Sequence, residues 1–377
     1  MKHTNKKLKD LICIAPFQDF MVLHDSTNVC CPEWFDIEQM QLEYPEEFAK
    51  HPGSRPFPGY VTSIEDRNNL LANWNNKFHK DLRKSVLDGD YRFCTKMCPH
   101  INEVYKNNKP AGSIQERELI KEWEINLKNP FPKRIYFNFD KSCNLKCPSC
   151  RVELITNKNN SVAEMTLESI DKQFGKTVQE IIITGSGDPF YSNIFRNWLQ
   201  NFDKTKYPKL EKIYLVSNGN MFTPKMWGSM SKAHNFIREM EWSIDAGTKN
   251  TYENITRLNG KWDKLMENMD YLASLNHFDN LLFSFVVQKQ NYTEMKTFVD
   301  LIHNKFKRSK SKAKVLFRAI QNWGHQSDSW FEDKNICDPQ HPDHSLLLEE
   351  LPKVLDHGLV SSNLRHLIKT PYKQLVI

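Results

Sequence analysis

Apolar runs alternate with stretches of helical periodicity from Lys133 onward, and this alternation restricts the fold more than any other feature of the sequence. Six apolar runs are typical of strands, at residues 134–139, 178–185, 212–219, 239–246, 281–288 and 313–320. Amphipathic stretches separate them, at residues 166–174, 193–202, 224–233, 261–275 and 291–306. Strands that alternate with helices predict an α/β fold with a parallel sheet and right-handed crossovers. In a barrel of this kind, the chemistry lies at the C-terminal ends of the strands.

The first hundred residues follow a different pattern. Residues 20–34 alternate around Asp25–Asn28, which predicts a hairpin of two short strands. An irregular stretch rich in Pro and Gly follows, and then residues 68–89 show the pattern of a helix that is closed by Gly89. We expect four regions: a small cysteine-rich domain over residues 1–106, a charged connecting helix over 107–132, the barrel over 133–325 and a C-terminal extension over 326–377.

Length and charge limit the classes of protein to which the chain can belong. With 377 residues it can form one large domain and a smaller one. Its longest apolar runs are far shorter than the roughly 20 residues of a membrane-spanning helix, so we expect no membrane contact. The 52 basic and 46 acidic residues are interspersed, so nucleic acid is not an expected partner. Because thiols are concentrated in short motifs and no apolar leader is present, we expect the cytoplasm.

Three cysteines, Cys143, Cys147 and Cys150, lie within eight residues directly after the first strand of the barrel region. A disulfide is not expected, because the number is odd and no secretory leader is present. Three thiolates on one loop can hold a metal centre and leave its fourth position open, as a catalytic centre requires. A zinc ribbon whose fourth ligand lies elsewhere in the chain is the alternative.

The stretch CNLKCPSC, together with the alternation of strands and helices, resembles the radical S-adenosylmethionine (SAM) enzymes, whose signature is CxxxCxxC. The resemblance implies a partial (β/α)6 barrel of the TIM type, in which Cys143, Cys147 and Cys150 bind a 4Fe-4S cluster and SAM occupies the fourth iron. It further implies reductive cleavage of SAM to a 5′-deoxyadenosyl radical, which abstracts hydrogen from a substrate, and an electron donor such as flavodoxin or ferredoxin. The chain departs from the family at Ser149, where an aromatic residue usually packs on the adenine.

Further motifs lie where the family binds SAM. The turn TGSGDPF after the second strand resembles the family's GGE-type turn, and its candidates for binding the methionine ammonium are Gly185, Ser186, Gly187 and Asp188. The candidates for the ribose and carboxylate of the cofactor, after the third and fourth strands, are Ser217, Asn218, Ser243, Asp245 and Arg257. Each of these residues also has a purely structural interpretation, as a turn residue or a helix N-cap.

A second group of cysteines precedes the barrel and resembles the auxiliary-cluster modules called SPASM or twitch domains, which usually follow the barrel. The resemblance implies a second 4Fe-4S cluster, within residues 1–106, on Cys13, Cys94, Cys98 and either Cys30 or Cys31. We favour Cys30, because the resemblance implies that this ligand ends the hairpin. Adjacent side chains on a strand point to opposite faces, so only one of the two joins easily. A zinc site with four cysteine ligands, one of them replaceable by His100, is the alternative.

Cys337 stands alone in the sequence, close to His341 and His344. It is a candidate catalytic residue, as a ligand or as a donor of a hydrogen atom, and an inert core cysteine is the alternative.

Auxiliary-cluster modules in the family mostly serve enzymes that modify peptides or proteins. The resemblance therefore implies a peptide or protein substrate and an oxidative modification: a crosslink, a dehydrogenation or a thioether. The second cluster would accept the electron that remains after hydrogen abstraction. The alternatives are a radical SAM dehydrogenase or epimerase of a small polar metabolite, and a non-enzymatic binding protein stabilised by zinc.

Overall fold

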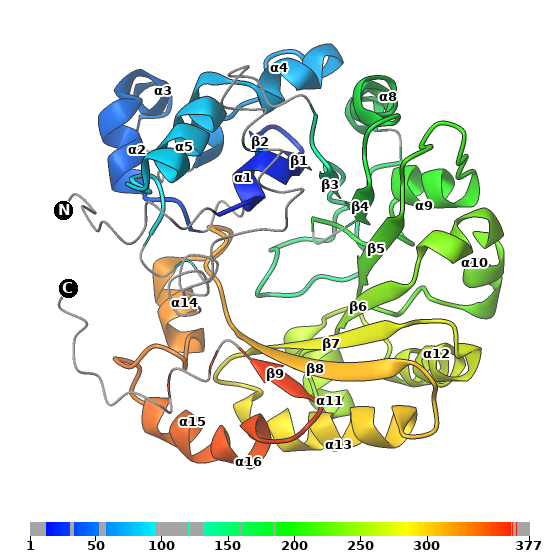
Figure 1. Cartoon of the computed structure of the whole chain (residues 1–377). Coiled ribbons are helices and arrows are strands. Elements are labelled where there is room, and N and C mark those ends of the chain that lie inside the picture. The colour runs from blue at the N-terminus through cyan, green and yellow to red at the C-terminus, as the bar shows by residue number, and fades with distance from the viewer. Residues whose placement is uncertain are drawn as a thin grey trace. The chain divides into compact units, whose positions relative to one another are not determined.

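The computed structural model describes residues 13–30, 34–52, 58–95, 98, 120, 131–158, 160–183, 186–362, 364 and 367. The chain divides into two compact units. The first contains Met1–Asp140, Asn159–Ile182 and Asp203–Glu211, and the second contains Lys141–Lys158, Ile183–Phe202 and Lys212–Ile377. Figure 1 shows the elements of both units in chain order, from blue at the N-terminus to red at the C-terminus.

The first unit contains a hairpin near the predicted place, but the predicted turn over Asp25–Asn28 was wrong, because Thr27 and Asn28 form its second strand. Strands β1 (Asp19–Leu23) and β2 (Thr27–Asn28) pair antiparallel. Strand β1 also pairs in parallel with β3 (Arg134–Asn138), and the strand order continues to β4 (Glu180–Ile183). The N-terminal segment therefore adds a strand directly beside the first strand that the sequence predicted for the barrel. Most of the predicted connecting helix, 107–132, lies outside the described residues, and the predicted domain boundaries stay a prediction.

Among its described residues, the first unit contains the helices α1 (Ala15–Gln18), α2 (Ile37–Glu43), α3 (Pro45–Ala49), η3 (Pro58–Tyr60), η4 (Arg67–Asn69), α4 (Leu70–Trp74), α5 (Lys77–Asp88) and α8 (Ser161–Phe174). The prediction of one helix over 68–89 was wrong, because the chain breaks at Asn75 and Asn76 caps α5 by accepting a hydrogen bond from the His79 N–H. The predicted end at Gly89 is confirmed by its left-handed φ of 74°. Trp74 and Phe174 pack edge-on against Phe20 in the core of this unit.

The second unit contains five parallel strands: β5 (Lys212–Ser217), β6 (Glu239–Ser243), β7 (Asn280–Val287), β8 (Lys312–Ala319) and β9 (Val360–Ser362). They are adjacent in chain order. The predicted mixed α/β architecture of parallel strands and helices is thereby confirmed, as a radical SAM partial barrel would require. Strand β9 was not predicted, because its three residues are too short to show a period.

The helices of the second unit are α9 (Asn193–Gln200), α10 (Pro224–Gly228), η5 (Ser231–Phe236), α11 (Lys249–Thr251), the π-helix η6 (Tyr252–Thr256), α12 (Trp262–Leu275), η7 (Tyr292–Glu294), α13 (Met295–Phe306), α14 (Asp328–Lys334), α15 (His344–Glu350) and α16 (Pro352–Leu355). Helix α13 packs against the apolar face of β7 and β8 (Figure 1), where Phe298 and Phe306 meet the rings of Phe285 and Phe283. The opposite face of these strands mixes polar residues, such as Ser284 and Arg318, with the apolar Leu282, Val286 and Leu316. No helix among the described residues is long and apolar enough to cross a membrane.

Candidate functional site

The cysteine loop, which we define as residues 141–158, gathers three thiols. Cys143 and Cys147 are only 7% and 4% exposed, and Cys150 packs against them and Leu145. Within the loop, the Cys150 N–H donates to the carbonyl of Cys147 at 2.9 Å, and the Cys143 N–H donates to the carbonyl of Ile155 at 3.0 Å. These short-range bonds fold the loop on itself and keep the three thiols together.

Each sulfur in this loop accepts a hydrogen bond from a polar side chain. The donors are Asn218 Nδ2 to Cys143 Sγ at 3.7 Å, Arg257 Nη1 to Cys147 Sγ at 3.3 Å and Arg151 Nη2 to Cys150 Sγ at 3.6 Å. Donors and cations favour the thiolate, which is the form that ligates a metal. Arg151 was not among the predicted site residues, although it directly follows the third cysteine in the sequence.

Burial acts in the opposite direction on these thiols. It raises the pKa of Cys143 to about 12, against the opposing charge of Arg151, and it raises the pKa of Cys147 against the opposing charge of Arg257. A metal centre bound here must therefore displace protons, because thiolates are the ligating form.

The donor set of the loop fits an iron-sulfur cluster: two buried thiols and one partly buried thiol with cationic and amide donors on their sulfurs. Within the described part of the chain, no three His, Cys, Asp or Glu side chains are close enough together to ligate one metal ion. A four-iron cluster holds its thiolate ligands further apart than a single ion does.

Asp188 is 1% exposed and is held entirely by protein groups. Its Oδ2 accepts from Ser217 Oγ at 2.8 Å and from the Asn218 N–H at 2.9 Å. Its Oδ1 accepts from the N–H groups of Phe190 and Tyr191 at 3.0 and 3.3 Å. A carboxylate has about four acceptor sites, and the protein's own donors fill them. Asp188 therefore joins the turn that it occupies to the end of β5, and this geometry does not direct its carboxylate at an ammonium.

The rest of this turn contributes backbone groups. The Asp188 N–H donates to the carbonyl of Ser142 at 2.9 Å, and the Ser186 carbonyl accepts from Arg151 Nη2 at 2.9 Å. Gly187 is half-buried, and Gly185 lies outside the described residues. The turn thus contacts the cysteine loop through two hydrogen bonds that involve main-chain atoms.

Ser217 and Asn218 end β5 beside the cysteine loop. Asn218 Nδ2 donates to Asn144 Oδ1 at 2.9 Å as well as to the sulfur of Cys143. Gly219 follows with a φ of 77°, and a Cβ there would lie 2.5 Å from the Trp242 ring, so only glycine fits this turn. The predicted turn chemistry of Asn218 and Gly219 therefore places an amide on a cysteine sulfur.

Asp245 and Arg257 form a buried ion pair with an Oδ2 to Nη2 distance of 2.7 Å. The Asp245 backbone has a positive φ of 59°, and the Val286 N–H and Asn291 Nδ2 hold the residue at 2.8 and 2.9 Å. Burial raises the pKa of the Asp245 carboxyl, and the guanidinium of Arg257 opposes the rise. Arg257, predicted to bind the methionine carboxylate, is thus engaged with Asp245 and Cys147. Ser243 accepts a hydrogen bond from Ser284 at 3.1 Å.

The first unit brings Cys13, Cys94 and Cys98 close to one another. Cys13 and Cys94 pack against a core that includes Tyr91, whose hydroxyl accepts from the Cys13 N–H at 3.1 Å. Burial raises the pKa of Cys13 to about 12, and the neighbouring Cys98 adds to the rise. Burial and the other two thiols also raise the pKa of Cys94. Cys30 is partly buried after β2, while Cys31 and His100 lie outside the described residues.

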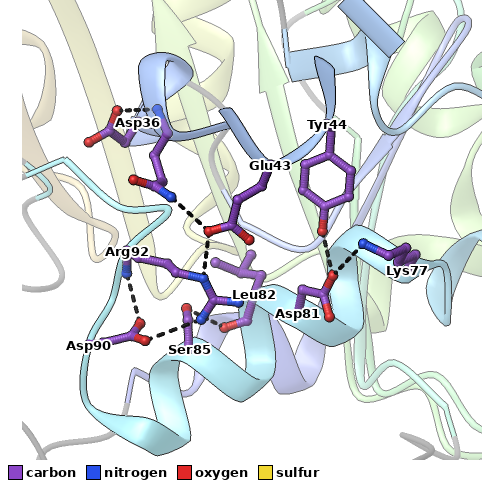
Figure 2. A network of polar contacts seen from close by, with 10 residues as sticks. Asp36, Glu43, Tyr44, Lys77, Asp81, Leu82, Ser85, Asp90 and Arg92 are labelled. Atoms are coloured by element: carbon purple, nitrogen blue, oxygen red, sulfur yellow. Dashed lines mark hydrogen bonds and ion pairs between the residues drawn. The ribbon is translucent and has the colours of Figure 1, made fainter. Parts of the chain in front are cut away.

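A polar network holds the segment that leads to Cys94 (Figure 2). Arg92 bridges Glu43 of α2 and Asp90 at 2.8 and 3.2 Å, and Tyr44 donates to Asp81 of α5 at 2.6 Å. Cys94 itself forms an antiparallel bridge with Phe35. Helices α2 and α5 thereby fix the position of Cys94.

Cys337 is a buried residue of the second unit, with its sulfur 4.0 Å from the Val287 carbonyl at the end of β7. Burial raises its pKa to about 12. His341 and His344 contact the backbone carbonyls of Asp333 and Ile336. The surroundings of Cys337 are those of a core thiol, and a catalytic role for Cys337 stays a prediction.

Residues 137–302 match the family model of the Radical SAM superfamily. This stretch of the chain is therefore similar to a radical SAM domain. The domain includes the three cysteines of the loop, Asp188 and Arg257, and it implies SAM and a 4Fe-4S cluster as cofactors. It does not include the N-terminal cysteines or Cys337.

Several solved structures resemble the chain distantly. Streptococcus suis SuiB bound to SAM is 14% identical, with 80% of this chain and 67% of that chain covered and a TM-score of 0.44. SuiB bound to precursor peptide SuiA is 13% identical, with 80% of this chain and 66% of that chain covered and a TM-score of 0.44. TYW1 with a lysine-pyruvate adduct bound is 14% identical, with 70% of this chain and 90% of that chain covered and a TM-score of 0.38. These similarities are too weak to assign a substrate. A comparison with curated proteins finds no match.

Proposed function

We propose that the chain cleaves SAM reductively and uses the resulting radical to abstract hydrogen from a substrate. The observation that carries the proposal is the gathering of three thiols, two buried and one partly buried, each hydrogen-bonded by a polar side chain, inside the stretch that matches the Radical SAM family model. Cys143, Cys147 and Cys150 would hold the 4Fe-4S cluster. When bound, the cluster and SAM supply the one-electron cleavage that generates the 5′-deoxyadenosyl radical.

The residues around the loop divide the work of binding the cofactor. The main-chain groups of Ser186 and Gly187 would face the methionine ammonium, and Asp188 would keep this turn in place through its four hydrogen bonds. Polar groups at the strand ends, Ser217, Asn218, Ser243 and Asp245, would line the ribose and carboxylate end. Arg257 would hold Cys147 while it is itself held by Asp245.

The finer proposal concerns the substrate. We propose that Cys13, Cys94, Cys98 and Cys30 hold an auxiliary 4Fe-4S cluster of the SPASM or twitch type and that a peptide or protein is oxidised. The closeness of Cys13, Cys94 and Cys98 in the first unit supports this proposal. An electron acceptor of this kind would allow loss of two hydrogens per event with formation of one 5′-deoxyadenosine. A small-metabolite dehydrogenase or epimerase is the second candidate, since Cys337 offers a thiol as a hydrogen-atom donor.

Anaerobic incubation of the reconstituted protein with SAM and dithionite tests the proposal. We expect slow formation of methionine and 5′-deoxyadenosine without any substrate, measured by chromatography, and none from the Cys147→Ala variant. The Lys296→Ala variant, which removes an exposed side chain of α13, serves as the control and should match the wild type. A wild-type protein that binds iron in the loop but never cleaves SAM would contradict the proposed function.

A further inference from the structure

Two buried arginines contact cysteines of the loop, and they differ in how their charge is balanced. Arg257, 9% exposed, pairs with the carboxylate of Asp245 at 2.7 Å. Arg151, 7% exposed, donates to the carbonyls of Lys141 and Ser186 at 2.8 and 2.9 Å and to the sulfur of Cys150. Among the described residues, no carboxylate forms an ion pair with Arg151.

The charged groups that act most strongly on Arg151 are the thiols of Cys143, Cys147 and Cys150. A buried charge without an opposite charge is costly, so a buried guanidinium calls for an anion close by. Two carbonyls satisfy hydrogen bonds of Arg151 but supply no net negative charge. The anion that completes this environment is the set of thiolates in the loop.

We propose that Arg151 is the counter-cation of the iron-sulfur cluster and raises the reduction potential of that cluster. The proposal rests on the proposed function, because it requires a cluster on the three cysteines. Arg257 contributes a hydrogen bond to Cys147, but the carboxylate of Asp245 largely neutralises its charge. Arg151 contributes both a hydrogen bond to Cys150 and an unbalanced positive charge.

The direction of the effect follows from charge. One-electron reduction makes the cluster and its thiolates more negative, and a fixed cation beside the sulfurs stabilises the reduced form more than the oxidised form. Removal of the Arg151 charge should therefore lower the potential. Removal of Arg257 and Asp245 together takes away a hydrogen bond and no net charge, so it should lower the potential less.

The test compares four reconstituted full-length proteins with the wild type: Arg151→Gln, Arg151→Lys, the double variant Arg257→Gln with Asp245→Asn, and Arg238→Gln as a control. Arg238 is exposed and pairs with Asp279, so its loss is a matched change of charge away from the loop. Iron content and circular dichroism report assembly and folding. Dithionite titration followed by electron paramagnetic resonance reports the potential, and the signal that changes on addition of SAM identifies the loop cluster.

We expect Arg151→Gln to reduce the ratio of reduced to oxidised loop cluster at fixed potential about tenfold, which is about 59 mV for a one-electron couple. Arg151→Lys should recover most of this ratio, and Arg238→Gln should show none of the loss. A folded Arg151→Gln protein that binds no iron, beside an Arg151→Lys protein that does, would also support a counter-cation.

Three results would overturn the inference: an Arg151→Gln cluster with the wild-type potential, equal shifts in Arg151→Gln and Arg151→Lys, or iron lost in both. The last two would trace the effect to the shape of the guanidinium rather than to its charge. A wild-type protein that assembles no SAM-responsive cluster would instead contradict the proposed function, so the two failures are distinguishable.

Discussion

The two groups of cysteines differ in their electrostatic surroundings. In the cysteine loop, guanidinium groups donate to the sulfurs of Cys147 and Cys150 and oppose the carboxylates of Asp188 and Asp245 that act on the loop thiols. In the first unit, the carboxylates that act on Cys13 and Cys94 are those of Asp19, Asp36 and Asp90. Cations stabilise thiolates and a reduced cluster, whereas carboxylates disfavour both. Thiol groups of similar size can therefore differ in the charges around their sulfurs. This difference predicts that the cysteine loop holds the more easily reduced centre.

Removal of the loop cysteines should produce the largest effect. We expect the Cys143→Ala, Cys147→Ala and Cys150→Ala triple variant to lose SAM cleavage completely and to retain about four of about eight iron atoms per chain. The reason is that the two thiol groups would bind their clusters independently. Iron and sulfide analysis after reconstitution measures the number of clusters that remain. Complete loss of iron would contradict the presence of two independent centres.

The complementary change in the first unit is Cys94→Ala. Here too about four iron atoms should remain, but cleavage of SAM should continue because the loop is intact. With a peptide substrate, the product that has lost two mass units should disappear while 5′-deoxyadenosine still forms, as mass spectrometry would show. Full product formation by this variant would make the N-terminal centre structural. Zinc in place of iron in the wild-type protein would favour the zinc alternative.

The fold was largely accessible from the sequence, and the partners of the site residues were not. Strand β3 begins at the predicted Arg134 because its alternating burial follows a period of two. The gathering of Cys143, Cys147 and Cys150 was predictable because they lie close together in the sequence. Arg257, in contrast, reaches Cys147 across 110 residues, which no local pattern encodes.

The role of Asp188 shows the same limit. A turn residue rich in acceptors looks like a ligand-binding group when its partners are not visible, and two of these partners lie 29 and 30 residues away in β5 and directly after it. The break between α4 and α5 was missed because the apolar pattern continues across Asn75 and Asn76. The low helix propensity of two asparagines is a weaker signal of a helix end than the apolar periodicity on both sides of them is of a continuous helix.

The next effect is on stability and tests whether the loop site is formed before any cofactor binds. Asp188→Ala would leave four donors without their acceptor, and we expect a loss of about 3 kcal/mol in the free energy of unfolding. Asp279→Ala removes an exposed carboxylate that pairs with Arg238 and should leave the free energy of unfolding nearly unchanged. Urea unfolding of the iron-free proteins measures both. An Asp188→Ala protein as stable as Asp279→Ala would show that the turn at 186–188 is not preorganised.

The smallest effect concerns pH and distinguishes the first unit. His79 of α5 is completely buried, and burial together with the neighbouring guanidinium of Arg83 lowers its pKa from 6.5 to about 3. Arg83 in turn donates to the Pro16 carbonyl at 2.7 Å, which holds the short helix that follows Cys13. Below pH 6.5 the unfolded chain binds a proton that the folded chain does not, so stability is retained above this pH and is lost as the pH falls toward 3.

Through His79, the free energy of unfolding should fall by at most about 1.4 kcal/mol per pH unit as the pH is lowered from 6 to 4. A His79→Gln variant should lose this part of the slope, because glutamine does not titrate, even where it lowers stability at pH 7. Unfolding curves of the iron-free wild type and variant at several pH values, followed by the fluorescence of Trp74 and the other tryptophans, measure the difference. Equal slopes for the two proteins would mean that His79 does not make the N-terminal cysteine region acid-sensitive, and the electrostatic contrast between the two regions would then rest on their carboxylates and guanidinium groups alone.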